Sequence, residues 1–282
     1  MKKIALLCCL ITLVGAFVFS GCSNDKPLLT KARENIHEVK SLSYNTETAT
    51  IATLTENGQV EEINFVGAGT NKTTLEPLAT SKYLRVKSGD EIYDIIAYGQ
   101  KENNSFVLYT NTSGTWQKSA MSLGQLSALT GSPSAVEICL QTASNLTPAG
   151  EGVINGRKAV KYTGSIKGAT LAAFNQALPE ITEQIINCGL EPQELSKLYQ
   201  KAEDVKVTFW LDQKSFLPLQ YDFDMVKFMQ SLVVIAQEKG ITPAGAQYDI
   251  EKAFTTITFT GYNNVDSIEV PSIVQEAVNI GS

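Results

Sequence analysis

The sequence is poor in the residues on which most catalytic and metal sites are built. Of its 282 residues only one is a histidine, His37, and only three are arginines. A metal centre or a Ser-His-Asp arrangement would depend on that single histidine, which lies in a segment with helical spacing. Glycine-rich phosphate loops and Cys-x-x-Cys pairs are also absent. We therefore expect no catalytic residue, no metal site and no cofactor, and interpret the chain as a non-enzyme.

Basic charge is scarce as well. The formal net charge is −6, and no run of lysines and arginines occurs. Nucleic-acid-binding domains and proteins that dock on anionic lipid by charge carry clustered basic residues. The composition therefore argues against both classes, and we expect no nucleic-acid partner.

The N-terminus carries a predominantly apolar run over residues 4–19. Two lysines precede the run, and small residues and Cys22 follow it. A membrane-spanning helix needs about 20 apolar residues, so the run is short for that purpose. A basic start, a short apolar segment and small residues before a cleavage site are typical of a secretory signal. The sequence therefore predicts a signal peptide over residues 1–21.

Cys22 stands where such a signal ends. Gly21-Cys22 followed by polar residues resembles a bacterial lipobox, with Phe19 in place of the usual aliphatic residue. The resemblance implies that the Cys22 thiol carries a diacylglycerol and that the chain is anchored at the extracytoplasmic face of the cell membrane. Two acyl chains give stable anchoring. The alternative is an ordinary signal peptide with an incidental cysteine. We predict lipidation at Cys22 and a short tether over residues 22–27.

Two cysteines lie beyond this anchor, Cys139 and Cys188. Outside the cytoplasm such a pair can form a disulfide, which would contribute about 4 kcal/mol for a loop of this length in the chain-entropy model. Two buried free thiols are the alternative, because cysteine also packs as a small apolar residue. The sequence gives no distance between the two residues, so both alternatives stay open.

The remaining chain, residues 28–282, is predicted to form one α+β domain. Helical spacing occurs in residues 29–39, 133–144, 171–188, 192–202 and 225–240. Five to seven antiparallel strands are expected between residues 43 and 119, with Asn57-Gly58 as a hairpin turn. Further hairpins are expected around Asn155-Gly156 and over residues 205–223, where Pro218 indicates an edge strand or a bulge. The carboxylates of the second hairpin, Asp212, Asp222 and Asp224, alternate with apolar residues, as expected on the wet face of a half-buried strand. Strand-rich blocks separated by helices favour a mainly antiparallel sheet.

The helical segments 171–188 and 225–240 carry more apolar residues than a cap on one sheet usually needs. They either pack against the sheet as plain core or leave a gap that holds an acyl chain. The candidate lining residues for such a cavity are Leu171, Phe174, Leu178, Ile181, Phe209, Phe228, Met229 and Leu232.

Short motifs near the C-terminus resemble a known group. The pattern Trp210-Leu211-Asp212 with Leu217-Pro218, and the closing Tyr262-Asn263 and Ile268 to Pro271, are similar to the LppX/LprG group of lipid-carrier lipoproteins, which share the LolA/LolB fold. In the order of its elements the resemblance extends over roughly the whole mature chain. In individual residues it is limited to these short motifs. It implies a curved, mainly antiparallel sheet, a half-barrel that wraps several helices around an apolar cavity.

We therefore expect a membrane-anchored extracytoplasmic lipoprotein that binds or carries a lipid or another hydrophobic ligand. An envelope protein would be a natural partner for delivery or receipt of that ligand. The alternative is a structural or sensory surface lipoprotein of the same fold, which has a filled core and docks on an envelope partner. A carrier needs an apolar cavity, and a docking module does not.

Overall fold

The fold was obtained as a computed structural model that describes residues 27–103, 105–112, 114–122, 133–175, 192–240 and 245–279. The helices in these ranges are α2 (Pro27–His37), α4 (Pro133–Thr142), α5 (Gly168–Asn175), α7 (Pro192–Lys201), α8 (Val226–Glu238) and the 3-10 turn η1 (Ser272–Glu276). The strands are β1 (Ser41–Glu56), β2 (Gln59–Leu75), β3 (Leu78–Ser88), β4 (Glu91–Glu102), β5 (Ser105–Asn111), β6 (Trp116–Ser122), β7 (Ser144–Ile154), β8 (Arg157–Ile166), β9 (Val205–Asp212), β10 (Pro218–Asp224), β11 (Gln247–Tyr262) and β12 (Val278–Asn279).

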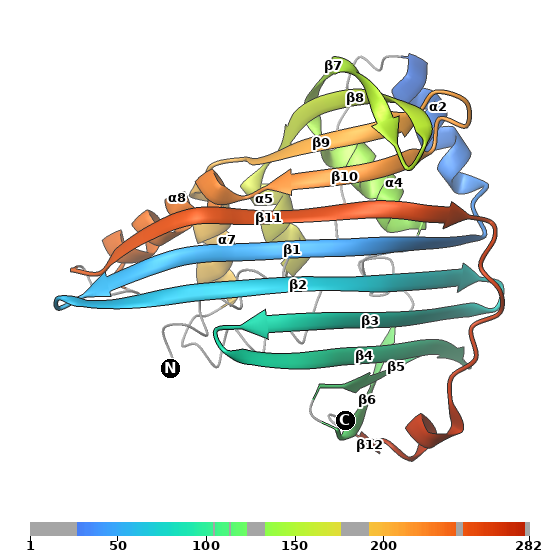
Figure 1. The fold of residues 1–282 in the computed structure, drawn as a ribbon, viewed down its shortest axis with the longest axis horizontal. Helices are drawn as coiled ribbons and strands as arrows, with labels where there is room; N and C mark the ends of the chain where they lie inside the picture. Colours follow the sequence, from blue (N-terminus) through green and yellow to red (C-terminus); the bar gives the residue numbers. More distant parts are fainter. Residues whose placement is uncertain are drawn as a thin grey trace.

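The described strands form one curved sheet of 12 strands in the order β12-β6-β5-β4-β3-β2-β1-β11-β10-β9-β8-β7 (Figure 1). All neighbours are antiparallel except β12 and β6, which run parallel. The first strand of the chain, β1, pairs with the late strand β11 along almost its whole length. The middle of the sheet is therefore built from residues at opposite ends of the sequence.

Hairpin turns form where the sequence predicts them. Asn57 and Gly58 join β1 to β2 with φ of 52° and 75°, and Asn155 and Gly156 join β7 to β8 with φ of 48° and 76°. Asparagine and glycine tolerate this left-handed region, which two-residue hairpins require. Pro218 begins β10, an interior strand, and a register shift follows it. The bulge expected at this proline is confirmed, and the edge position is wrong.

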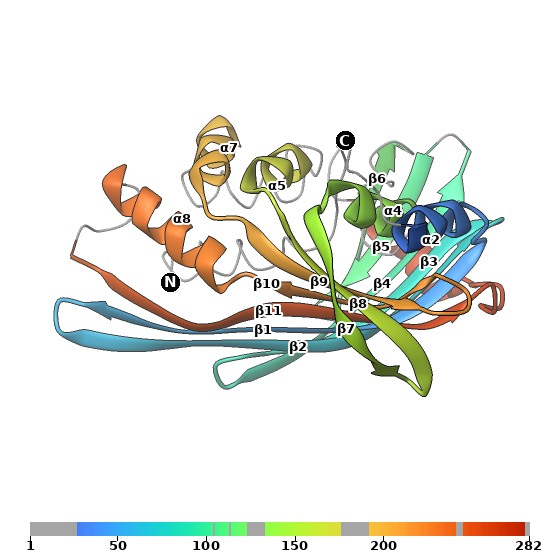
Figure 2. The same cartoon turned by 90° about the horizontal axis from the view of Figure 1, so that it is seen from above.

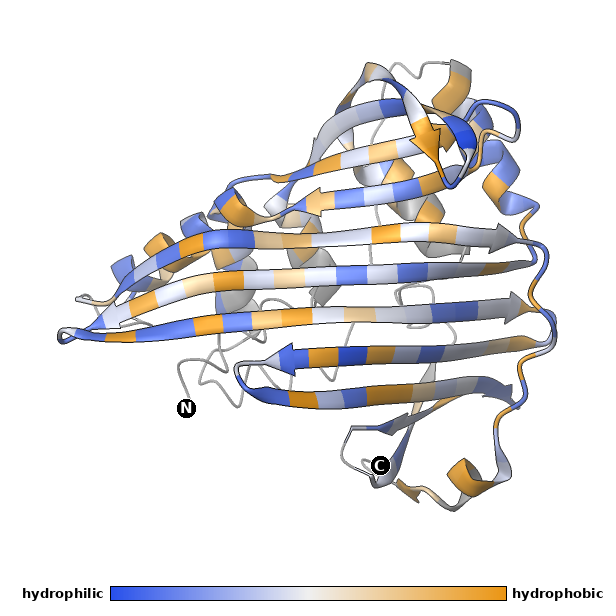
Figure 3. Ribbon diagram, viewed as in Figure 1, coloured by the Kyte–Doolittle hydropathy of each residue, from blue (hydrophilic) through white to orange (hydrophobic). Residues whose placement is uncertain are grey.

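Alternating burial along the strands defines two faces of the sheet. On β2, Ile63, Phe65 and Gly67 are buried, whereas the residues between them are exposed. The same alternation of apolar and polar residues is visible along the strands in Figure 3. We call the face that carries Phe65 and Val86 the inner face, and its opposite the outer face. Side chains of successive strand residues point to opposite faces, so each strand contributes to both.

The helices lie on the inner face. In Figure 2, α2, α4, α5, α7 and α8 all stand on the same side of the sheet. One buried cluster joins them to it, with Ile36 from α2, Leu140 from α4, Phe228 from α8 and Phe209 from β9 among its members. Their apolar stripes are buried there because a helix stripe and a sheet face exclude water together.

The predicted fold class is therefore confirmed at the level of a curved, mainly antiparallel sheet with helices on one face. Six strands, β1 to β6, occupy the region where five to seven were expected. The wrapping of helices by a half-barrel is a finer statement and stays a prediction. No helix among the described residues has both the length and the apolar character to cross a membrane. The signal peptide, Cys22 and most of the tether lie outside the described residues.

Candidate ligand-binding face

Five of the predicted cavity residues lie together in the core between helices and sheet. Their side chains are almost fully buried within one cluster: Leu171, Phe209, Phe228, Met229 and Leu232. Phe228 also stacks on Tyr199 of α7, with 5.3 Å between ring centroids. Phe174 belongs to α5, while Leu178 and Ile181 lie outside the described residues. The role of these residues as cavity lining stays a prediction.

A row of inner-face residues is less buried than its surroundings. The strand register places Ile257, Thr46, Gly69, Leu84 and Ile95 side by side on β11, β1, β2, β3 and β4. All five are half-buried, and we call them the half-buried row. Five strands spaced about 4.8 Å apart give the row a length of about 19 Å.

The residues next to this row show what full coverage looks like. Val86 is 0% exposed, and Phe259 and Tyr44 are 4% and 3% exposed. The half-buried row faces the same side, yet its leucine and isoleucines keep part of their surface accessible. Closely packed protein interiors leave few such gaps in a layer of apolar side chains. The row is therefore an incompletely covered part of the inner face.

One lysine points into the same face. Lys82 lies two residues before Leu84 on β3, so both side chains share the inner face, and its register partners are Asn71 and Ala97. The side chain is half-buried, and loss of contact with water lowers the pKa of its ammonium group. Sequence reasoning missed Lys82. The sequence does carry a signal for it: Lys82 lies two and four residues before Leu84 and Val86, so its side chain shares their face in an alternating strand.

The resembling motif around Asp212 has a structural role. Asp212 is 3% exposed, and its Oδ1 accepts hydrogen bonds from the backbone N–H groups of Lys214 (2.6 Å) and Ser215 (3.0 Å). Its Oδ2 pairs with Arg157 at 2.5 Å. Burial raises the pKa of this carboxyl, but the two backbone hydrogen bonds and the arginine outweigh it and lower the pKa. Asp212 therefore organises the β9–β10 turn, and its expected place on the wet face of the hairpin is wrong.

The second motif lies at the same end of the sheet, next to the β9–β10 turn. The Asn263 side chain accepts a hydrogen bond from the backbone N–H of Lys40 at 2.6 Å, and the Tyr262 hydroxyl donates to the Pro218 carbonyl at 2.8 Å. These contacts tie the end of β11 to the starts of β1 and β10. Both motifs thus fix the position of strands.

Cys139 lies on α4 as a buried free thiol. Burial raises the pKa of the Cys139 thiol well above its ordinary value, so little of it is the reactive thiolate at neutral pH. Cys188 lies outside the described residues, and the disulfide between the two cysteines stays a prediction.

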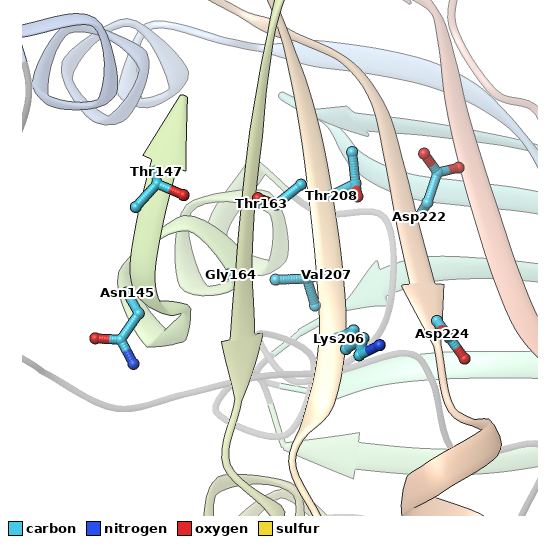
Figure 4. A pocket seen from close by; sticks show the side chains of 9 residues that line it. All are labelled: Asn145, Thr147, Thr163, Gly164, Lys206, Val207, Thr208, Asp222 and Asp224. Atoms are coloured by element: carbon cyan, nitrogen blue, oxygen red, sulfur yellow. The ribbon is translucent and has the colours of Figure 1, made fainter. Parts of the chain in front are cut away.

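The outer face has a shallow groove of about 450 Å³ beside β7 to β10 (Figure 4). It is lined by Asn145, Thr147, Thr163, Gly164, Lys206, Val207, Thr208, Asp222 and Asp224. Asp222 already accepts hydrogen bonds from Gln220 and Thr256, at 2.8 Å and 2.9 Å. Its carboxylate is therefore engaged within the sheet.

His37 ends α2 and is exposed to solvent. In the part of the chain that the structure describes, no three histidine, cysteine or acidic side chains are grouped in a way that would hold a metal ion.

These features describe a class of protein with a curved antiparallel sheet, helices on one face, and a row of half-buried residues on that face. A family model of unknown function, DUF6612, matches residues 24–279, and the chain belongs to this family. The comparison with curated proteins gives no match.

Several solved structures are similar to this chain. LprF from Mycobacterium bovis is 12% identical at a TM-score of 0.47, with 86% of this chain and 95% of that chain covered. LppX from Mycobacterium tuberculosis is 15% identical at a TM-score of 0.42, with coverages of 87% and 100%. A LolA superfamily protein from Nitrosomonas europaea is 11% identical at a TM-score of 0.20, with coverages of 88% and 94%. The resemblance to LppX-like proteins that the motifs indicate is thus also found among solved structures.

Proposed function

We propose that this protein binds a lipid or another hydrophobic ligand between its helices and the inner face of its sheet, and that it does so without catalysis. The observation that carries the proposal is the half-buried row. Leu84, Ile95 and Ile257 face the helix side, yet the protein does not bury them as it buries Val86 beside them.

The energetic reason is the hydrophobic effect. Each square ångström of apolar surface removed from water contributes about 25 cal/mol. A hydrocarbon chain lying along a row of about 19 Å would cover the half-buried side chains and remove its own surface from water. The fully buried cluster around Phe228 and Leu232 would form one wall, and the strands β1 to β4 the floor.

Enclosure of the ligand is a further part of the proposal. A sheet that curls around its helices as a half-barrel would shield the ligand on several sides. The predicted lining residues Leu178 and Ile181 would then complete the wall. A signal over residues 1–21 and a diacylglycerol on Cys22 would hold the protein at the extracytoplasmic face of the membrane, where a partner in the envelope could deliver or receive the ligand.

Two adjacent residues on β4 provide a matched test. Ile95 belongs to the half-buried row, whereas Ile96 is equally half-buried but lies on the outer face, opposite Tyr83. The full chain with Cys22→Ser, which removes the proposed anchor, would be purified from bacteria and examined by native mass spectrometry with lipid extraction. We expect a bound lipid, lost in Ile95→Trp because the indole fills the row, and kept in Ile96→Trp.

Circular dichroism and thermal melting would establish that both variants are folded. If the chain stays free of adducts after incubation with membrane lipids, or if both tryptophan variants keep the adduct equally, the ligand does not lie on this row. In the first case the alternative of a docking lipoprotein with a filled core becomes the better description.

A further inference from the structure

The inner face carries a positive charge where a hydrophobic ligand would be expected to meet only apolar and neutral groups. Lys82 lies on β3 two residues from Leu84, a distance of about 6.6 Å along an extended strand. Its ammonium group is thus adjacent to the half-buried row. Most lysines of the sheet point outward into water, as the exposed Lys72 and Lys87 do.

The charge of Lys82 has no partner among the described residues. No ion pair or hydrogen bond to its ammonium group is found there, and no acidic group raises its pKa. The inner-face residues beside it are Asn71 and Ala97, which pair with it, and Thr80 and Leu84 on its own strand. None of them is charged, and the Asn71 amide donates to Thr46 Oγ1 at 3.2 Å.

A half-buried lysine without a counter-charge loses part of its hydration, which is unfavourable for the folded protein. Buried charges are normally paired, because removing an ammonium group from water is unfavourable unless an anion replaces the lost hydration. An exposed position on the same strand would avoid this cost. A ligand that carries an anion would offset it, and the ion pair would be stronger than in water because the surroundings are less polar.

We propose that the ligand of the inner face is an amphipathic molecule with a hydrocarbon chain and one anionic oxygen group, and that this group pairs with Lys82. The inference rests on the proposed function, because it assigns a headgroup position to the same ligand. The hydrocarbon chain follows the half-buried row from Leu84, and the carboxylate or phosphate accepts hydrogen bonds from the Lys82 ammonium group. The Asn71 amide and the Thr80 hydroxyl are the nearest neutral polar groups of the inner face.

The test uses three ligands with the same chain and different headgroups: dodecanoate, dodecyl phosphate and dodecan-1-ol. Their binding to the full chain with Cys22→Ser would be measured by isothermal titration calorimetry at neutral pH, below the concentration at which each ligand aggregates. We expect at least one of the two anions to bind about tenfold or more tightly than the alcohol, because charge-assisted hydrogen bonds are the stronger ones. The anion that does so identifies the headgroup class.

Three variants separate the charge from the side chain. Lys82→Met keeps the length and removes the charge, so it should weaken anion binding about tenfold and leave the alcohol unchanged. Lys82→Arg should keep the preference for the anion. Lys87→Met changes an exposed lysine of the same strand on the outer face and should have no effect.

The outcomes distinguish this inference from the proposed function. If anions and alcohol bind equally well, and Lys82→Met changes neither, the headgroup inference is overturned while lipid binding stands. If none of the three ligands binds, both fail. Inorganic phosphate and acetate complete the set: if either binds as tightly as the amphipathic anions, the site takes a free anion, and the assignment of a lipid headgroup is wrong.

Discussion

Replacement of Asp212 should destabilise the protein by an amount that its contacts define. Asp212→Ala removes the acceptor of two backbone hydrogen bonds, from Lys214 and Ser215, and the ion pair with Arg157. Hydrogen bonds to a charged group contribute about 1.5–3 kcal/mol each. Because the turn is accessible to water, the lower end applies, which gives about 3 kcal/mol for the two.

The ion pair adds less. The Arg157 side chain is 45% exposed, so solvent screens the pair, which then contributes about 1 kcal/mol or less. Asp212→Asn keeps the acceptor Oδ1 but loses this pair and weakens the two backbone hydrogen bonds, because their acceptor is then neutral. We therefore expect about 3–4 kcal/mol of destabilisation for alanine and about 2 kcal/mol for asparagine. For a chain of this size, these values correspond to roughly 10 °C and 6 °C in Tm.

Urea unfolding followed by circular dichroism measures both values, with Asp249→Asn as the control, because Asp249 is exposed on β11. The folded-state pKa of Asp212 is lowered, so its contribution is complete above the unfolded aspartate pKa of 3.8 and is lost as the pH falls below it. The difference between wild type and Asp212→Asn should accordingly shrink below about pH 4. Equal stability of Asp212→Ala and the control would refute the role assigned to this carboxylate.

Four further outcomes are expected. Cys139 should resist iodoacetamide in the native protein and react in urea, because burial raises its pKa; rapid native labelling would contradict its burial. Gly58→Val should lower the urea midpoint, since valine is strained at a φ of 75°, whereas Gly245→Val, at an uncrowded glycine without positive φ, serves as the comparison. Leu232→Ala should cost about 2–5 kcal/mol in the same assay, and a loss below 1 kcal/mol would argue against full burial. Cys22→Ala should move the protein from the membrane fraction to the soluble fraction, as judged by immunoblotting, and unchanged membrane retention would contradict lipidation at this residue.

Local patterns predicted much of the fold, and the site only in part. Asn57-Gly58 and the alternation in β2 depend on neighbouring residues, and both are found as expected. The pairing of β1 with β11 has no local signal, because it joins residues from opposite ends of the chain. The same holds for the half-buried row: only four successive strand registers place Ile257 and Ile95 at its two ends, and their exposure depends on what the helices leave uncovered.

At Asp212 a local pattern was present but gave the wrong prediction. Because Asp212 alternates with apolar neighbours, the pattern predicted an outward, hydrated carboxylate. The contacts that Asp212 makes in the β9–β10 turn outweigh this pattern. A side chain that satisfies two backbone donors and one arginine can be buried at a position where a pattern indicates water.

The central place of β11 has a consequence for how the chain folds. The side chain of Asn263 binds the backbone of Lys40, 223 residues away, and β11 lies between β1 and β10. Until β11 has been synthesised, β1 and β10 cannot be joined through it, and pairings between residues so far apart in the sequence form slowly. The polypeptide should therefore remain incompletely folded until synthesis is nearly finished. A delay of this kind would suit the export that the proposed signal peptide implies.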